Sequence, residues 1–93
     1  MEPQQLRALL GKNIRLVTAW RGLTLARVAA YAGISEASLN HALAGRAAMT
    51  VDRLAKIANV LELEPKLFFE RDLRAILKPT PRMVANEGRR QRR

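Results

Sequence analysis

The stretch from Thr24 to Arg46 constrains the fold most, because its pattern predicts two short helices joined by one tight turn. Gly33 lies between the two runs. A glycine adopts a positive φ at little cost, so it can end the first helix and reverse the chain. Ser35 then follows as the expected N-cap of the second helix. Apolar residues recur at helical spacing on both sides of the glycine: Leu25, Val28, Ala29 and Ala32 before it, and Ile34, Leu39, Ala42 and Leu43 after it.

The second predicted helix keeps one face free of large apolar residues. The side chains there are short or polar, and such a helix in a basic protein fits the major groove of DNA, where base edges offer donors, acceptors and methyl groups. Two crossed helices with a glycine turn also occur in small helical bundles of other function, so that alternative stays open. The residues on this face are Ser35, Glu36, Ala37, Ser38, Asn40 and His41.

The charge balance favours a polyanionic partner. Seventeen Lys and Arg against eight Asp and Glu give the 93-residue chain a net charge of +9, which suits nucleic acid through counterion release. A solvated basic surface without a specific partner is the alternative. The chain has no Cys, so we expect no disulfide framework, and no apolar run has the length of a membrane span. We expect one small domain in the bacterial cytoplasm, associated with the nucleoid and not with a membrane.

Two longer helices are predicted around the central pair. The first begins at Pro3 and ends near Arg21 and Gly22, since proline is tolerated at a first helical position. The second follows Thr50 as its N-cap, with Asp52 in its first turn. This second helix has the clearest amphipathic pattern of the chain, so we expect it to serve as a scaffold. Its predicted core-facing residues are Val51, Leu54, Ile57, Ala58 and Leu61.

A last helix is expected to begin around Pro65 and carries more apolar residues than one buried face needs. Leu67 and Phe68 would close the core. The other apolar residues would form an exposed stripe, and two-fold self-association is a commoner use for such a stripe than internal burial. The residues of this predicted dimer surface are Phe69, Leu73, Ile76 and Leu77.

The sequence changes character after Lys78. Pro79, Pro81 and Gly88 interrupt helix formation, and residues 78–93 hold six basic groups and one acidic group. We therefore divide the chain into a domain of residues 1–78 and a basic tail of residues 79–93, which is predicted to be disordered. The tail would either add phosphate contacts or serve only as a solubilising end.

Several motifs between Gly11 and Phe69 resemble the Cro/C1-type, or XRE-like, helix-turn-helix family. They are Ile14-Arg15, Arg21-Gly22-Leu23-Thr24, Val28-Ala29, Ala32-Gly33-Ile34-Ser35, Leu39, Gly45-Arg46 and Leu54-Ala55-Lys56-Ile57-Ala58. The resemblance implies an all-α, compact five-helix, lambda-repressor-like DNA-binding domain that acts as a homodimer on an inverted-repeat operator. The last predicted helix is similar to the dimerising end of restriction-modification controller proteins. A controller, or a relative from a phage or mobile element, is therefore the expected context.

The resemblance also implies which residues contact DNA. Transferred onto matching positions, base-reading contacts fall on Glu36, Ala37, Asn40 and His41. Contacts to the DNA backbone would come from Arg21, Thr24, Arg27, Ser35, Ser38, Arg46 and Thr50. Three positions depart from the family pattern. Leu25 stands where a Gln often holds a phosphate, Leu43 stands where a Glu is often found near the end of the second helix, and Glu62 stands where the scaffold helix commonly ends in Gly.

An enzymatic function is not expected. His41 is the only histidine of the chain, and neither a carboxylate pair nor a glycine-rich phosphate loop accompanies it, so the pattern predicts no catalytic site, metal or cofactor. The remaining alternative is a protein-binding antitoxin or anti-activator that masks its partner with the apolar stripe. For a regulator, the position of the operator relative to the promoter would decide between repression and activation, and RNA polymerase is a second candidate partner.

Overall fold

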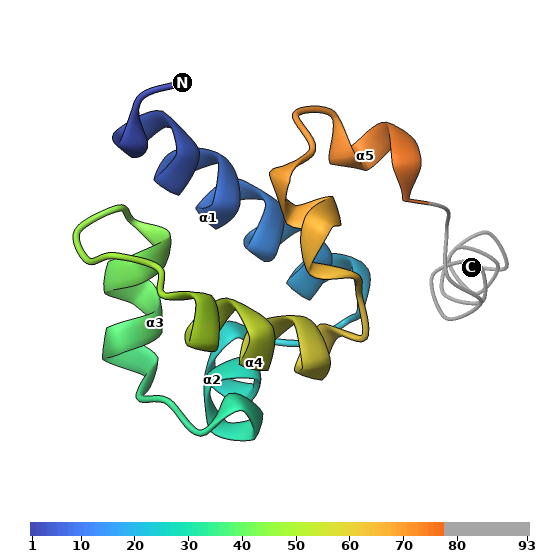
Figure 1. The fold of residues 1–93 in the computed structure, drawn as a ribbon. Helices are drawn as coiled ribbons and strands as arrows, with labels where there is room; N and C mark the ends of the chain where they lie inside the picture. Colours follow the sequence, from blue (N-terminus) through green and yellow to red (C-terminus); the bar gives the residue numbers. More distant parts are fainter. Residues whose placement is uncertain (78–93) are drawn as a thin grey trace, which may run out of the picture.

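Helices follow one another through residues 1–77, the part of the chain that the computed structural model describes (Figure 1). The elements are α1 (Pro3–Trp20), α2 (Leu25–Ala32), α3 (Glu36–Leu43), α4 (Val51–Leu61), a 3₁₀ helix η1 (Pro65–Phe69) and α5 (Leu73–Ile76). The predicted all-α class is confirmed over this range. The predicted tail, residues 79–93, and Lys78 lie outside the described residues.

Local sequence signals set most of the helix ends where they were predicted. Proline opens α1 at Pro3, and the helix ends at Trp20, directly before the expected stop. The hydroxyl of Thr24 caps α2 by accepting a hydrogen bond of 3.2 Å from the amide of Arg27. Thr50 caps α4 in the same way, at 3.1 Å. Each cap satisfies one of the free amides of a helix N-terminus.

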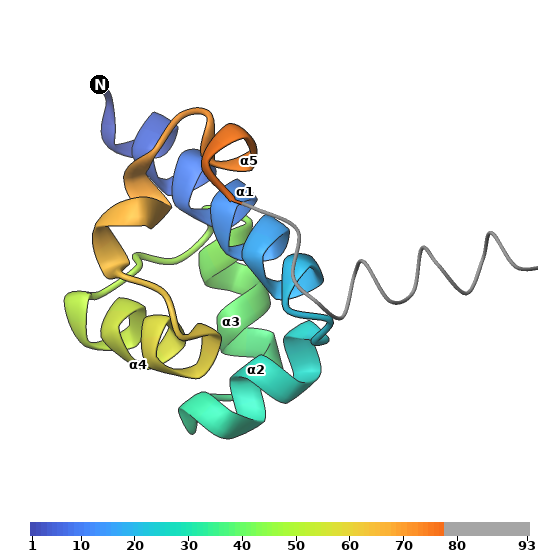
Figure 2. The same ribbon diagram turned by 90° about the vertical axis from the view of Figure 1, so that its right-hand side faces the viewer.

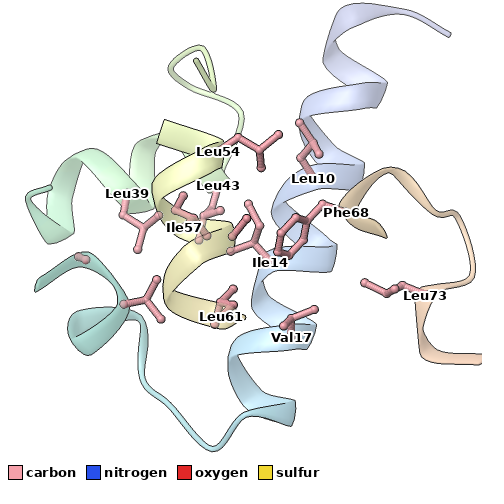
Figure 3. Packing of buried hydrophobic residues seen from close by; sticks show 13 residues of the cluster. Leu10, Ile14, Val17, Leu39, Leu43, Leu54, Ile57, Leu61, Phe68 and Leu73 are labelled. Carbon is pink, nitrogen blue, oxygen red and sulfur yellow. The ribbon is translucent and has the colours of Figure 1, made fainter. Parts of the chain in front are cut away.

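One apolar core lies between α1, α4 and the short helices around them (Figure 3). Full burial of each large side chain contributes about 1.5–3 kcal/mol relative to exposure. The prediction that Val51 faces this core is wrong, since its side chain is 82% exposed at the first position of α4. The labelled core residues are Leu10, Ile14, Val17, Leu39, Leu43, Leu54, Ile57, Leu61, Phe68 and Leu73.

The contact between α1 and α3 depends on Gly11, which is buried. A Cβ at this position would collide with the backbone carbonyl oxygen of Leu43 at the end of α3. The absence of a side chain therefore lets α1 approach the backbone of α3 directly. This close approach fixes the end of α3 against the longest helix of the domain.

Replacing Gly11 by Ala tests this close approach. Helix propensity alone predicts a gain of about 1 kcal/mol in the free energy of unfolding. We expect instead a net loss of about 2 kcal/mol, because overpacking against backbone costs about 3 kcal/mol. Urea unfolding measures the difference, and Ala19→Gly at an exposed position of α1 calibrates the propensity effect. A stabilised Gly11→Ala protein would contradict the expected collision.

The predicted last helix begins at Pro65, but it is not continuous. The backbone leaves the helical region at Glu70, which has φ −74° and ψ 132°, and α5 begins only at Leu73. Asn13 of α1 explains the break, since its Nδ2 donates hydrogen bonds of 2.7 Å to the carbonyl oxygens of both Phe68 and Glu70. These carbonyls face α1 and are not available to an unbroken helix.

The break also changes the predicted apolar stripe. Leu73 is only 1% exposed and belongs to the core, so its assignment to an exposed surface is wrong. Leu77 is half-buried against the same core. Phe69 and Ile76 remain exposed, at 44% and 47%. The alternative function as a partner-masking module loses the residue at the centre of its proposed surface.

Glu62 ends α4 in a backbone conformation that suits glycine better. Its φ is 54°, and it is the one described non-glycine residue with positive φ. We expect Glu62→Gly to raise the free energy of unfolding by about 0.5 kcal/mol, because relief of a left-handed strain of about 1 kcal/mol outweighs the greater freedom of glycine in the unfolded chain. Thermal unfolding of Glu62→Gly is compared with that of Glu62→Ala, which removes the charge but keeps the Cβ. The comparison checks whether relief of backbone strain is the cause. An equal gain in both variants would point to the lost charge instead.

Candidate nucleic-acid interface

The turn between α2 and α3 has the geometry that the sequence predicted. Gly33 has φ 73° and ends α2 in the left-handed region. Its amide donates to the carbonyl of Ala30 at 3.2 Å, and the amide of Ile34 donates to the carbonyl of Ala29 at 3.0 Å. These two bonds close the end of α2. Ala29 is 2% exposed, so its small side chain lies where α2 and α3 pack together.

A pair of serines fixes the start of α3. The Ser35 hydroxyl accepts a hydrogen bond of 3.0 Å from the amide of Ser38 and donates one of 2.8 Å to the Ser38 hydroxyl. The proton of Ser35 is thus used within the cap, whereas the Ser38 hydroxyl keeps its own proton for another acceptor. Both serines are predicted to contact the DNA backbone, and of the two Ser38 is the better placed to donate a hydrogen bond to a phosphate.

The four predicted base-reading residues share the exposed face of α3. Glu36, Ala37, Asn40 and His41 are all exposed, and the spacing of one and four residues between them places them along one side of the helix. The opposite side is buried in the core through Leu39, Ala42 and Leu43. Within residues 1–77, the side chains of Glu36, Asn40 and His41 form no hydrogen bond or ion pair. Their donors and acceptors are available to a ligand.

Arg46 follows α3 in a fixed position. Gly45 has φ 78° and turns the chain, and the amide of Arg46 donates to the carbonyl of His41 at 2.9 Å. The backbone of Arg46 is therefore tied to the end of the helix, while its side chain is exposed. The other predicted backbone contacts, Thr24, Arg27 and Thr50, are exposed as well. The Thr24 and Thr50 hydroxyls accept the cap bonds and still have a proton to donate.

Arg21 is placed differently from the other predicted contacts. Its Nε donates to the carbonyl of Leu61 at 2.7 Å, and its Nη2 donates to that of Glu62 at 2.8 Å. The guanidinium also lies 4.7 Å from the ring centroid of Trp20. A cation at the C-terminus of α4 is favoured by the helix dipole. We therefore assign Arg21 a structural role and leave it out of the DNA contacts proposed below.

The described residues form neither a metal-binding cluster nor a membrane-spanning helix. Residues 1–77 contain no group of three or more His, Cys, Asp or Glu side chains placed to hold a metal ion. Over the same range, no helix combines the length and the apolar character that crossing a membrane requires.

Comparison with known protein families agrees with this geometry. The helix-turn-helix family model HTH_3, of the Cro/C1-type or XRE-like class, matches residues 12–68. The match spans more than half of the chain and includes all of α2, α3 and α4. The chain therefore belongs to this helix-turn-helix family, whose members are DNA-binding regulators of transcription and not enzymes. A comparison with curated proteins gives no significant match.

Proposed function

We propose that the protein is a sequence-specific regulator that binds an inverted-repeat operator as a homodimer and controls its own gene. The observation that carries this proposal is the free face of α3, where Glu36, Ala37, Asn40 and His41 are exposed while the other side of the helix is buried. A helix held in this way can enter the major groove without disturbing the core.

Each of these side chains has chemistry that suits a base edge. Asn40 can pair with the N6 and N7 atoms of adenine, Glu36 can accept from the amino group of cytosine, and Ala37 can contact the methyl group of thymine. His41 adds a further polar group on the same face. None of the four is Arg, the commonest partner of guanine. We therefore expect moderate affinity for each half-site, with dimer formation and DNA shape supplying part of the selectivity.

Around this face, exposed polar and basic groups are proposed to hold the DNA backbone. Arg27 and Arg46 supply positive charge, and the hydroxyls of Thr24, Ser38 and Thr50 supply neutral donors. Ser35 contributes through the cap that orients Ser38. Such contacts set the position of α3 on the duplex, and the bases contacted by α3 set the sequence preference.

The proposed dimer surface is smaller than the sequence predicted. Phe69 and Ile76 are its exposed apolar residues, and the half-buried Leu77 lies at its edge. A symmetric dimer would place its two copies of α3 about 34 Å apart, so the operator half-sites should be one helical turn apart. A cytoplasmic, nucleoid-associated protein of the restriction-modification controller, phage or mobile-element type fits this proposal, and RNA polymerase is a candidate second partner.

Binding to the DNA directly upstream of its own gene tests the function. The protein is titrated near physiological salt against this duplex and against a scrambled duplex of equal length. We expect a preference of about a thousandfold for the upstream DNA, with cooperative loading of the dimer. Equal and steeply salt-dependent affinity for both duplexes would mean that only charge acts, and would overturn the proposed sequence-specific function.

A further inference from the structure

A basic groove lies between α1 and the segment that leads into α5. In the ribbon views, α5 lies on the side of α1 that faces away from α3 (Figure 1, Figure 2). The more enclosed part of the groove is a hollow of about 470 Å³ between the second half of α1 and the segment that leads into α5. A shallower hollow continues it along the first half of α1 toward Met1. Lys12 and Arg71 line both hollows, so the two adjoin, and we describe them together as one groove.

The rim of the groove has an excess of positive charge without an internal partner. Lys12 and Arg15 approach it from α1, while Arg71 and Arg74 approach it from the other side, and Asp72 is the one carboxylate in its lining. Within the part of the chain that the structure describes, none of these four cations forms an ion pair or a side-chain hydrogen bond. Bringing four cations together costs free energy through mutual repulsion, which an anionic partner would relieve.

The floor of the groove is apolar. Leu9 lies in the shallower hollow and Leu16 in the more enclosed one, and both side chains are half-buried. A phosphate backbone would neutralise the rim but would leave this floor without an apolar contact. A polypeptide with both carboxylates and apolar side chains would satisfy the rim and the floor together. From Gln5 to Leu16 the groove follows α1 for about 17 Å, the length of a short helical segment.

We propose that this groove binds an acidic, amphipathic segment of a partner protein. The tail of the same chain is an unsuitable occupant, because residues 78–93 hold six basic groups and one acidic group. The groove lies across α1 from α3, so the partner and DNA would occupy the protein at the same time. The site would thus recruit an acidic protein to the operator, a role separate from DNA recognition itself.

Fluorescence anisotropy with the full-length protein tests the proposal. The probe is a labelled synthetic peptide, about four helical turns long, with Glu on one face and Leu at helical spacing on the other. Poly-Glu of equal length serves as the reference for charge alone. The test variant is Lys12→Glu/Arg71→Glu. Its matched control, Lys56→Glu/Lys66→Glu, makes the same change in net charge at exposed positions outside the groove.

We expect the groove variant to bind the peptide at least about tenfold more weakly and the control variant to lose less than about twofold. Leu9→Gln should weaken binding of the amphipathic peptide and leave binding of poly-Glu unchanged. Saturation with duplex DNA should not displace the peptide.

Four results would overturn the proposal. Equal losses in the two charge variants would show that net charge alone attracts the peptide. Displacement of the peptide by DNA would place it on the DNA-binding surface. A loss of DNA affinity confined to Lys12→Glu/Arg71→Glu would assign the groove to nucleic acid. The absence of peptide binding would likewise overturn it, whereas the upstream-DNA titration would still test the proposed operator binding by itself.

Discussion

Replacing both Asn40 and His41 by Ala is expected to lower affinity for the operator by about 100-fold while leaving the fold and the dimer intact. Both side chains are exposed on α3 and form no hydrogen bond or ion pair within residues 1–77, so their removal costs the folded protein little. A good base contact contributes about 1–3 kcal/mol of discrimination, and the loss of two accounts for a change of this size. Titration of operator and scrambled duplexes measures it.

The outcome for scrambled DNA separates base reading from general attraction. Affinity for the scrambled duplex should change by less than about threefold, since nonspecific binding depends on phosphate contacts. Asn59→Ala on the exposed side of α4 is the matched control and should leave both affinities unchanged. A parallel loss on operator and scrambled DNA would show that Asn40 and His41 act on the backbone. An unchanged operator affinity would contradict the proposal that α3 contacts the bases.

The partner-masking alternative is tested at Ile76 and not at Leu73. Leu73 is buried in the core, so a charge at this position would unfold the domain and report nothing about a surface. Ile76→Ser changes an exposed apolar residue and leaves the core complete. This variant therefore tests association through α5, with oligomeric state in solution as the measurement.

The features that local sequence decides were predictable. Gly33, Ser35 and Thr50 act through the residues next to them, because a left-handed turn or an N-cap needs only a neighbouring amide or carbonyl. The apolar periodicity of α3 also fixed which of its faces is buried, and hence which face remains for DNA. The candidate reading surface could be located from sequence for this reason.

Interactions between distant parts of the chain were not predictable. The contact of Arg21 with the DNA backbone stays a prediction, but the structure gives its side chain hydrogen bonds to the carbonyls of Leu61 and Glu62, 40 and 41 residues away. No pattern near Arg21 indicates this contact. Val51 shows a different limit, since apolar type at helical spacing does not indicate whether the first turn of a helix extends past the core.

Among the contacts between distant parts of the chain, those of Asn13 have the largest predicted effect on the free energy of unfolding. Its Nδ2 donates to the carbonyls of Phe68 and Glu70, and the residue is fully buried. Asn13→Ala would leave both carbonyls without their donor and open a small cavity. We expect a loss of about 3 kcal/mol in the free energy of unfolding, since each buried polar group that loses its partner costs about 1–3 kcal/mol. Urea unfolding measures this loss, and Asn59→Ala should change stability by less than about 0.5 kcal/mol.

Hydrogen exchange separates this specific role from a general loss of packing. Asn13 joins α1 to the segment from η1 to α5, so the amides of Glu70 and Leu77, which donate to the carbonyls of Leu67 and Leu73 within that segment, should lose protection first. The α3 amides should keep theirs relative to global unfolding. Because Arg71 and Phe69 belong to the same segment, Asn13→Ala should also weaken peptide binding in the groove and association through α5. Uniform loss of protection in α3 and α5 would instead mean that Asn13 supports the whole core equally.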